Sequence, residues 1–280
     1  FELSGALVSA QEIHLGGPSR DGIPAIDNPK FVAAGKASFL DGKDWVLGLV
    51  RNGEARAYPI SIMNWHEIVN DKVGGGRVAI TYCPLCGTGV AFTSEVGGRS
   101  LSFGVSGLLY KSDVLLYDRE TESLWSQLLN KAIAGPMKGR KLSVLPLTHT
   151  TWRAWKRAQP DTLVLSTETG YRRDYDRDPY GGYEKERELY FPVGAKSRRY
   201  HPKERVLGLE VGGKFKAYPF AELSRTGEST IRDTLGGKDL VVNFDWANES
   251  AWALDASGAQ LPAVTSFWFA WYAFHPDTAV

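Results

Sequence analysis

The chain has 280 residues, 43% of them hydrophobic and nine of them Trp, so it is long enough and apolar enough to bury a sizeable core. Its 33 Lys and Arg residues nearly balance its 32 Asp and Glu residues, so we expect no nucleic-acid partner and no attraction to anionic lipid. The longest apolar run, residues 267–274, is far shorter than the roughly 20 residues that span a bilayer, which excludes an integral membrane helix.

Residues 1–44 have the pattern of an arm laid over the surface. Turn and extended signals follow one another without a sustained period, as in Gly22-Ile23-Pro24 and Asn28-Pro29. Because such Pro and Asn residues restrict an extended chain, we expect residues 22–31 to be pinned rather than free. The chain begins at Phe1 rather than Met, which is compatible with a removed leader and with a trimmed sequence alike.

From residue 45 onward the pattern predicts a hairpin, a helix and a strand. Residues 45–50 and 55–58 are strand-like, and Asn52-Gly53 is a hairpin turn between them. Pro59 suits the first position of a helix that would run to about Val69. Residues 78–82 then form a strand that leads into Cys83.

The same series returns in the second half of the chain. Val46-Leu47-Gly48-Leu49, eight residues and Tyr58-Pro59 match Val206-Leu207-Gly208-Leu209, eight residues and Tyr218-Pro219. The segments Trp152 to Thr162 and Trp268 to Thr278 share the spacing Trp-x2-Trp-x4-Pro-Asp-Thr. This indicates an internal duplication, and two units that cannot each bury a face alone would pack into one body.

We therefore predict an α+β fold made of two unequal hairpin-helix-strand repeats packed into one body. Residues 45–165 form repeat one, which carries the site and an insertion. Residues 166–204 form a polar excursion over the surface, and residues 205–280 form repeat two.

The only two cysteines lie together in the sequence Cys83-Pro84-Leu85-Cys86-Gly87. Pro84 fixes its φ near about −65° and Gly87 permits a positive φ, so a tight turn points both sulfurs to the same side. Such a turn binds a soft metal, supports dithiol/disulfide redox chemistry or forms a small structural disulfide. All three alternatives stay open at this stage.

The repeat serves as an internal control on which groups are special to one copy. Aligned between copies, His66 faces Thr226, Cys83 faces Phe244 and Cys86 faces Ala247, so only copy one carries the three ligand types. Two thiolates and one imidazole suit copper, with zinc as the alternative. We predict a metal site formed by Cys83, Cys86 and His66. The side chains that could complete it are His149, His201 and His275.

Three long motifs carry a resemblance to known sequences. They are NWHEIVND at residues 64–71, TYCPLCGT at residues 81–88 and FWFAWYAFHPDT at residues 267–278. The chain resembles a bacterial and archaeal family catalogued only as a domain of unknown function. The resemblance implies an exported protein, periplasmic or secreted, with or without a lipid anchor. It implies no established activity.

Four further residues are candidates for catalysis: Glu67, Ser106, Arg119 and Glu120. Glu67 adjoins His66, while Arg119 and Glu120 lie in the insertion, and all three could act as acid/base groups or could belong to a charged surface. Ser106 partly matches the hydrolase pattern Gly-x-Ser-x-Gly, but the second Gly falls on Leu108. A plain Gly-rich turn accounts for Ser106 equally well.

The sequence thus predicts an exported soft-metal protein, specifically a metal-dependent oxidoreductase that acts on a small-molecule or peptide substrate in a pocket lined by the insertion. The alternatives are a metal-binding or delivery protein without turnover, and a thiol-disulfide oxidoreductase. Acid/base groups in a closed pocket would favour an enzyme, and a shallow exposed site would favour delivery. The metal, the substrate and the oligomeric state are not determined by the sequence.

Overall fold

The computed structural model describes residues 1–280 and is mostly β, with 41% of residues in strands and 14% in helices. The four α-helices have seven residues each. They are α1 (Ile60–His66), α2 (Trp152–Ala158), α3 (Phe220–Thr226) and α4 (Trp268–Phe274). The predicted α+β fold of hairpin-helix-strand repeats is therefore wrong, because helices of two turns cannot form a layer and the sheets carry the core.

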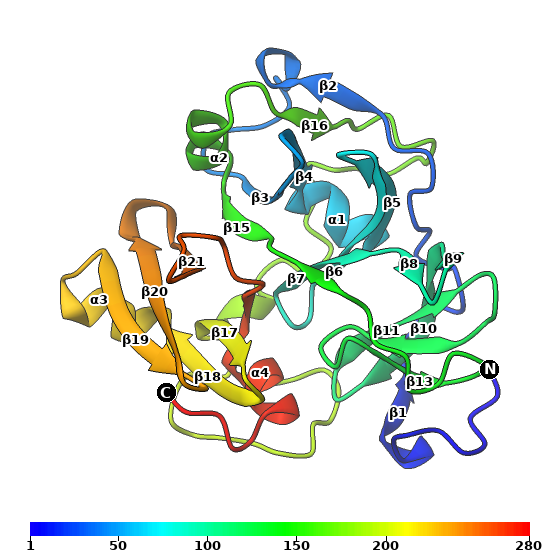
Figure 1. Cartoon of the computed structure of the whole chain (residues 1–280). Helices are drawn as coiled ribbons and strands as arrows, with labels where there is room; N and C mark the ends of the chain where they lie inside the picture. Colours follow the sequence, from blue (N-terminus) through cyan, green and yellow to red (C-terminus); the bar gives the residue numbers. More distant parts are fainter.

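Three of the six sheets are formed by strands between residues 13 and 165 (Figure 1). One contains, in spatial order, β1 (Ile13–Leu15), β10 (Phe103–Tyr110), β11 (Asp113–Asp118), β12 (Leu124–Ser126) and β13 (Lys131–Ala134). The second contains β14 (Val144–Leu145), β7 (Thr88–Thr93), β6 (Gly76–Cys83) and β5 (Ile68–Val73). The third contains β15 (Thr148–Thr151), β3 (Trp45–Arg51), β4 (Glu54–Pro59), β16 (Leu163–Leu165) and β2 (Phe31–Ala33).

The remaining sheets are smaller. One contains β18 (Lys214–Pro219), β17 (Arg205–Val211) and β22 (Val264–Phe267), and another contains β19 (Thr230–Leu235), β20 (Lys238–Asp245) and β21 (Ser250–Asp255). A two-stranded ribbon pairs β8 (Glu95–Val96) with β9 (Arg99–Ser100). Pairing is antiparallel in every named ladder except between β16 and β4.

The local reason for the wrong helix length lies at the end of α1. Pro59 is the N-cap, as the sequence indicates, but the helix ends at His66 because Glu67 adopts the left-handed conformation with φ 57°. The β-branched Ile68 and Val69, which we expected to close the helix, instead begin β5, where β-branched side chains are favoured. The hairpin at Asn52-Gly53 is as predicted, with φ of 49° and 79° at its two turn residues.

Two segments of the chain share one order of elements. The series β3, β4, α1, β5, β6 and β7 is followed by β15 and α2, and the series β17, β18, α3, β19, β20 and β21 is followed by β22 and α4. The closing strands cross over, because β22 contacts β7 of the first segment and β15 contacts β21 of the second.

Matching contacts accompany this shared order. A Cβ on Gly48 would lie 2.3 Å from a ring carbon of Trp155, and a Cβ on Gly208 would lie equally close to Trp271. Both Gly residues therefore let a closing-helix indole lie flat on the sheet.

The N-terminal arm is held by backbone hydrogen bonds. Ile26 donates to the Ile68 carbonyl at 2.9 Å and accepts from the Asn70 N–H at 2.9 Å, and it is buried. Farther toward the N-terminus, β1 pairs with β10. None of the helices has the length and apolar content needed to cross a bilayer.

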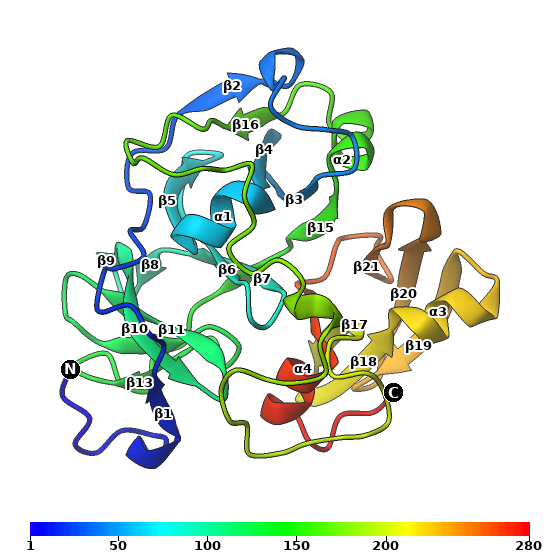
Figure 2. The same ribbon diagram turned by 180° about the vertical axis from the view of Figure 1, so that it is seen from behind.

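Residues 166–204 are more than the surface excursion that we expected. They contain little regular structure beyond the 3₁₀ turn Tyr183–Lys185, and they run from the β16 end of the molecule past α1 toward α4 (Figure 2). Tyr183 is buried in the largest core cluster, and the Trp65 indole N–H donates to the Arg177 carbonyl at 3.1 Å. This segment covers α1 and the region of the cysteine turn.

Candidate metal centre

The cysteine turn joins β6 to β7 and is closed by its own backbone. The Cys86 N–H donates to the Cys83 carbonyl at 3.2 Å, and the Gly87 N–H donates to the Pro84 carbonyl at 3.3 Å. Gly87 has φ 58°, and a Cβ there would lie 2.9 Å from the Phe267 ring, so only Gly fits. Both sulfurs lie on one side, because the Cys86 and Cys83 Sγ atoms are 3.3 and 3.8 Å from the Ser112 carbonyl oxygen.

The carboxyl group of Asp113 joins the two sulfurs. The Sγ atoms of Cys83 and Cys86 and one carboxyl oxygen of Asp113 all lie within 4.8 Å of one another. All three side chains are buried, and both cysteines are free thiols. Asp113 begins β11 directly after a tight turn whose residues Lys111 and Ser112 have φ of 52° and 69°. That turn places the carboxyl group over the cysteines.

The hydrogen bonds of Asp113 are incomplete. Its Oδ2 atom accepts from the Leu128 N–H at 3.0 Å, whereas the buried Oδ1 atom has no partner. Buried polar atoms in folded proteins nearly always have a partner, and the groups beside this carboxyl group are the Cys83 and Cys86 thiols. We call Cys83, Cys86 and Asp113 the Cys2Asp cluster.

The pKa values of all three groups of the Cys2Asp cluster are raised, so their negative forms are disfavoured. Burial raises the pKa of the Cys83 thiol and raises that of Cys86 well above its usual range. Burial likewise raises the pKa of Asp113 to about 7. Nearby carboxyl groups, Asp113 for both thiols and Glu67 for Cys83, push the thiol pKa values further up. The thiols therefore stay protonated unless a cation enters.

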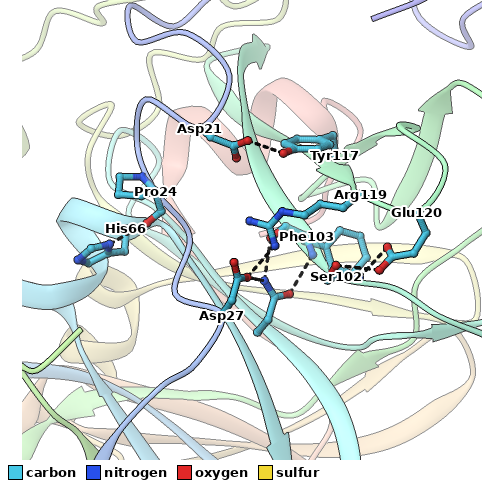
Figure 3. Close-up of polar contacts among 10 residues, drawn as sticks. Asp21, Pro24, Asp27, His66, Ser102, Phe103, Tyr117, Arg119 and Glu120 are labelled. Carbon is cyan, nitrogen blue, oxygen red and sulfur yellow. Dashed lines mark hydrogen bonds and ion pairs between the residues drawn. The ribbon is translucent and has the colours of Figure 1, made fainter. Parts of the chain in front are cut away.

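His66 is not brought to the sulfurs. Its Nδ1 atom lies 2.7 Å from the Pro24 carbonyl oxygen and its Nε2 atom 2.7 Å from the Tyr175 hydroxyl, so both ring nitrogens are occupied. Figure 3 shows the imidazole at the Pro24 carbonyl of the N-terminal arm. His66 is buried, and burial lowers its pKa. His66 therefore links α1 to the N-terminal arm and to residues 166–204. The third group beside the two sulfurs is Asp113 and not His66.

The other histidines also lie outside the Cys2Asp cluster. The His149 ring makes edge contacts with Trp45 and Tyr82, the His201 Nδ1 atom accepts from the Lys203 N–H at 3.2 Å, and the His275 ring stacks on Phe215 at 4.0 Å.

Three of the catalytic candidates have structural or surface roles. The Ser106 hydroxyl donates to the Leu115 carbonyl and accepts from the Leu108 N–H at 3.0 Å, which spans the irregularity in the β10–β11 ladder. Arg119 pairs with Asp27 at 2.7 Å, and Glu120 accepts from the Ser102 hydroxyl at 2.8 Å and from its N–H at 2.9 Å (Figure 3). These groups hold the arm and a strand end in place.

Glu67, the fourth candidate, is different because its carboxyl group is buried near the cluster. Burial, with a contribution from Asp113, raises the pKa of Glu67 to about 8. Its side chain lines a cavity of about 220 Å³ together with Leu85 and Val114, the chain neighbours of Cys86 and Asp113. Larger cavities lie elsewhere, one of about 650 Å³ beside Trp155 and Trp252.

Comparison with known families gives one match. The model of a family described as "Protein of unknown function (DUF3179)" matches residues 20–260. The chain belongs to the DUF3179 family. The part that matches DUF3179 includes the Cys2Asp cluster, Glu67 and the arm residues at His66, and it ends before α4. Neither the curated proteins nor the solved structures that were compared with the chain gave a match.

Proposed function

We propose that this protein binds one thiophilic metal ion through Cys83, Cys86 and Asp113. The observation that carries the proposal is the Cys2Asp cluster itself, in which three buried ligand atoms lie within 4.8 Å of one another. A cation would deprotonate the thiols, give the orphaned Asp113 Oδ1 atom a partner and offset the buried negative charge. The charges that act on the two thiols are negative: the Cys83 sulfur and Asp113 for Cys86, and Asp113 and Glu67 for Cys83.

The donor set favours zinc over copper. Zinc accepts thiolate sulfur and carboxylate oxygen in one tetrahedral site, whereas copper(I) selects soft sulfur ligands. Three protein ligands leave one position for water or substrate, which is the arrangement of catalytic rather than structural zinc sites. An ion there would polarise a carbonyl group or activate a water molecule.

The burial of the cluster favours an enzyme over a delivery protein. Cys86 is 0% exposed and Cys83 is 2% exposed, so a partner protein could not reach both sulfurs to exchange an ion. The cavity beside the cluster, with the carboxyl group of Glu67 in its wall, has room for a small substrate.

Metal content measured on variants tests this proposal. Protein purified without an affinity tag, reduced and loaded with zinc or copper(I), should retain one ion per chain after desalting. Cys83→Ser and Asp113→Asn should each lower the affinity by at least tenfold, with no such change for the control Asp71→Asn, whose carboxyl group accepts from Tyr58 at 2.7 Å. If the parent retained no stoichiometric ion of either metal, the proposal would be wrong.

A thiol-disulfide oxidoreductase is the second candidate, favoured by the two buried carboxyl groups beside the turn. In that reaction the Cys83 and Cys86 thiols would form a disulfide while a peptide disulfide is reduced to two thiols. The protons that leave Cys83 and Cys86 would pass to the two thiols formed, and Asp113 and Glu67 are placed to relay them. The raised thiol pKa values oppose attack by Cys83 or Cys86. If this candidate holds, the reduced, metal-free protein should catalyse the reduction of a peptide disulfide by glutathione, followed by mass spectrometry, and Cys86→Ser should not; no catalysis by the parent would exclude it.

A further inference from the structure

The cavity next to the Cys2Asp cluster has a mostly apolar wall that contains one carboxyl group, Glu67, and two tyrosines, Tyr180 and Tyr190. Nine of its 13 lining residues are hydrophobic, among them Leu85, Val105, Leu109 and Val114. Glu67 is the only acidic residue of the lining, which contains no Lys, Arg or His. Its volume of about 220 Å³ is below the roughly 300 Å³ at which drug-sized pockets begin. A ligand there would be about the size of one substituted ring.

Glu67 has a left-handed backbone conformation, which is unfavourable for a residue other than Gly. Helices α1 and α3 both follow a Pro N-cap and both end in the left-handed conformation, at Glu67 with φ 57° and at Gly227 with φ 71°. Gly is the usual residue at such a position, and another residue costs about 1 kcal/mol or more there. The second segment has the usual residue, while the first has a buried glutamate that faces the cavity.

We propose that this cavity binds a small uncharged molecule with an apolar body and one hydrogen-bonding group, and that Glu67 is the residue that holds that group. An anion would lie against Glu67 and near Asp113 with no cation in the wall to pair with. A cation would have to lose its water to form an ion pair among apolar side chains, which offsets much of the attraction. As the substrate site of a metal enzyme the cavity rests on the proposed function, but binding itself needs no metal.

A matched series of ligands tests the inference: benzyl alcohol, benzylamine and benzoate, which share one ring and differ in charge. Titrations followed by protein NMR should show benzyl alcohol binding in the micromolar to millimolar range, benzylamine at least tenfold weaker and benzoate without saturable binding. Shifts should centre on Leu85, Leu109 and Val114. No saturable binding of benzyl alcohol, or tighter binding of benzylamine or benzoate, would overturn the inference.

Variants separate this cavity from other surfaces. Glu67→Ala should weaken benzyl alcohol at least tenfold, whereas Glu67→Gln, which keeps a neutral hydrogen-bonding group, should stay within about threefold of the parent. Leu109→Trp should fill the cavity and abolish binding, and Leu15→Trp, at a side chain that is 79% exposed, should not. If Leu109→Trp fails to fold, the two Glu67 variants decide, and equal affinity for both would contradict the role of Glu67.

The variant Cys83→Ser, stripped of metal with a chelator, separates the two proposals. Benzyl alcohol bound equally by parent and Cys83→Ser supports the cavity whatever becomes of the metal. A parent that retains zinc and binds none of the three ligands would leave the proposed function standing and would overturn this inference.

Discussion

The hairpins β6–β7 and β20–β21 have the same strand pairing and loop length, but the turn of the first is buried and the turn of the second is exposed. Each joins its strands through four residues, from Cys83 to Thr88 and from Asp245 to Ser250. In the first hairpin the turn is buried, with Leu85 8% exposed and Cys86 0% exposed. In the second hairpin the turn is a short 3₁₀ helix whose Trp246 is 43% exposed. The paired strands alone therefore do not create the site. It depends on the residues of the turn and on the segments that cover the turn.

What covers the first turn comes from elsewhere in the chain. The Lys111-Ser112 turn brings a carbonyl oxygen and the Asp113 carboxyl group to the sulfurs. The Phe267 N–H, at the start of α4, donates to the Cys86 carbonyl at 2.8 Å. The second hairpin has no sheet like β10 and β11 over it, so its turn stays at the surface. A comparison of the two hairpins thus indicates that the site originates in the insertion of the first segment, the part between the cysteine turn and α2 that contains β10 and β11.

The largest expected effect concerns the Trp-on-Gly contact that the two segments share, Trp155 on Gly48 and Trp271 on Gly208. Trp155→Ala and Trp271→Ala should each lower the free energy of unfolding by about 3 to 5 kcal/mol, because each removes a buried indole lying on a Gly and bonded to Thr162 or Thr278. Urea unfolding would measure both, with Trp246→Ala as the exposed control. If one of the two variants had the same free energy of unfolding as the parent, the closing helices α2 and α4 would not have equivalent roles.

The C-caps of the closing helices should differ in their response to pH. Gln159 caps α2 and His275 caps α4 with nearly the same backbone angles. Burial, with a smaller contribution from Lys111, lowers the pKa of His275 to about 4, so below about pH 6.5 the unfolded chain takes up a proton that the folded chain does not. Stability should thus fall as pH drops from 6.5 toward 4.

The variant His275→Gln makes the second cap like the first and should remove this part of the pH dependence. Between pH 7 and pH 5 the parent should lose about 1 to 2 kcal/mol more than the variant. Urea unfolding at the two pH values measures it, with Gln159→Ala as control. Identical slopes for parent and His275→Gln would contradict the buried, neutral His275.

The smallest expected effect concerns the helix ends at Glu67 and Gly227. Gly227→Ala should destabilise the protein by about 1 kcal/mol, because its φ of 71° disfavours a Cβ although no atom lies within 4 Å. Glu67→Gly should stabilise it by up to about 1 kcal/mol, since it relieves the same strain and removes a buried carboxyl group. Thermal melts would measure both changes. Destabilisation by Glu67→Gly would mean that the glutamate is kept for packing.

Local signals in the sequence predicted much of what the structure contains. Asn52-Gly53 predicted a hairpin, Pro59 a helix start, and Cys-Pro-x-Cys-Gly a tight turn with both sulfurs on one side, because each rests on backbone angles fixed within a few residues. The family resemblance is confirmed by the match over residues 20–260. The fold class was wrong because short apolar runs such as Ile68-Val69 fit a helix and a strand alike.

The third group of the site could not be found in this way. Asp113 reaches the cysteines only because the turn between β10 and β11 lies against the turn between β6 and β7, and no spacing rule links residue 113 to residue 83. One local signal was present, since Lys111-Ser112-Asp113 is a polar turn between two apolar strands. His66 was a reasonable choice by residue type, but the hydrogen bond from its ring to Pro24 depends on the course of the arm.

In the proposed metal centre, two sulfurs and one carboxylate hold the ion without an imidazole. X-ray absorption at the zinc edge of the loaded protein tests this arrangement most directly. We expect two sulfur neighbours at about 2.3 Å and oxygen neighbours at about 2.0 to 2.2 Å, with no imidazole scattering and with a smaller oxygen contribution in Asp113→Asn. An imidazole signal that disappears in His66→Ala, or a shell without sulfur, would contradict the Cys2Asp cluster as the metal centre.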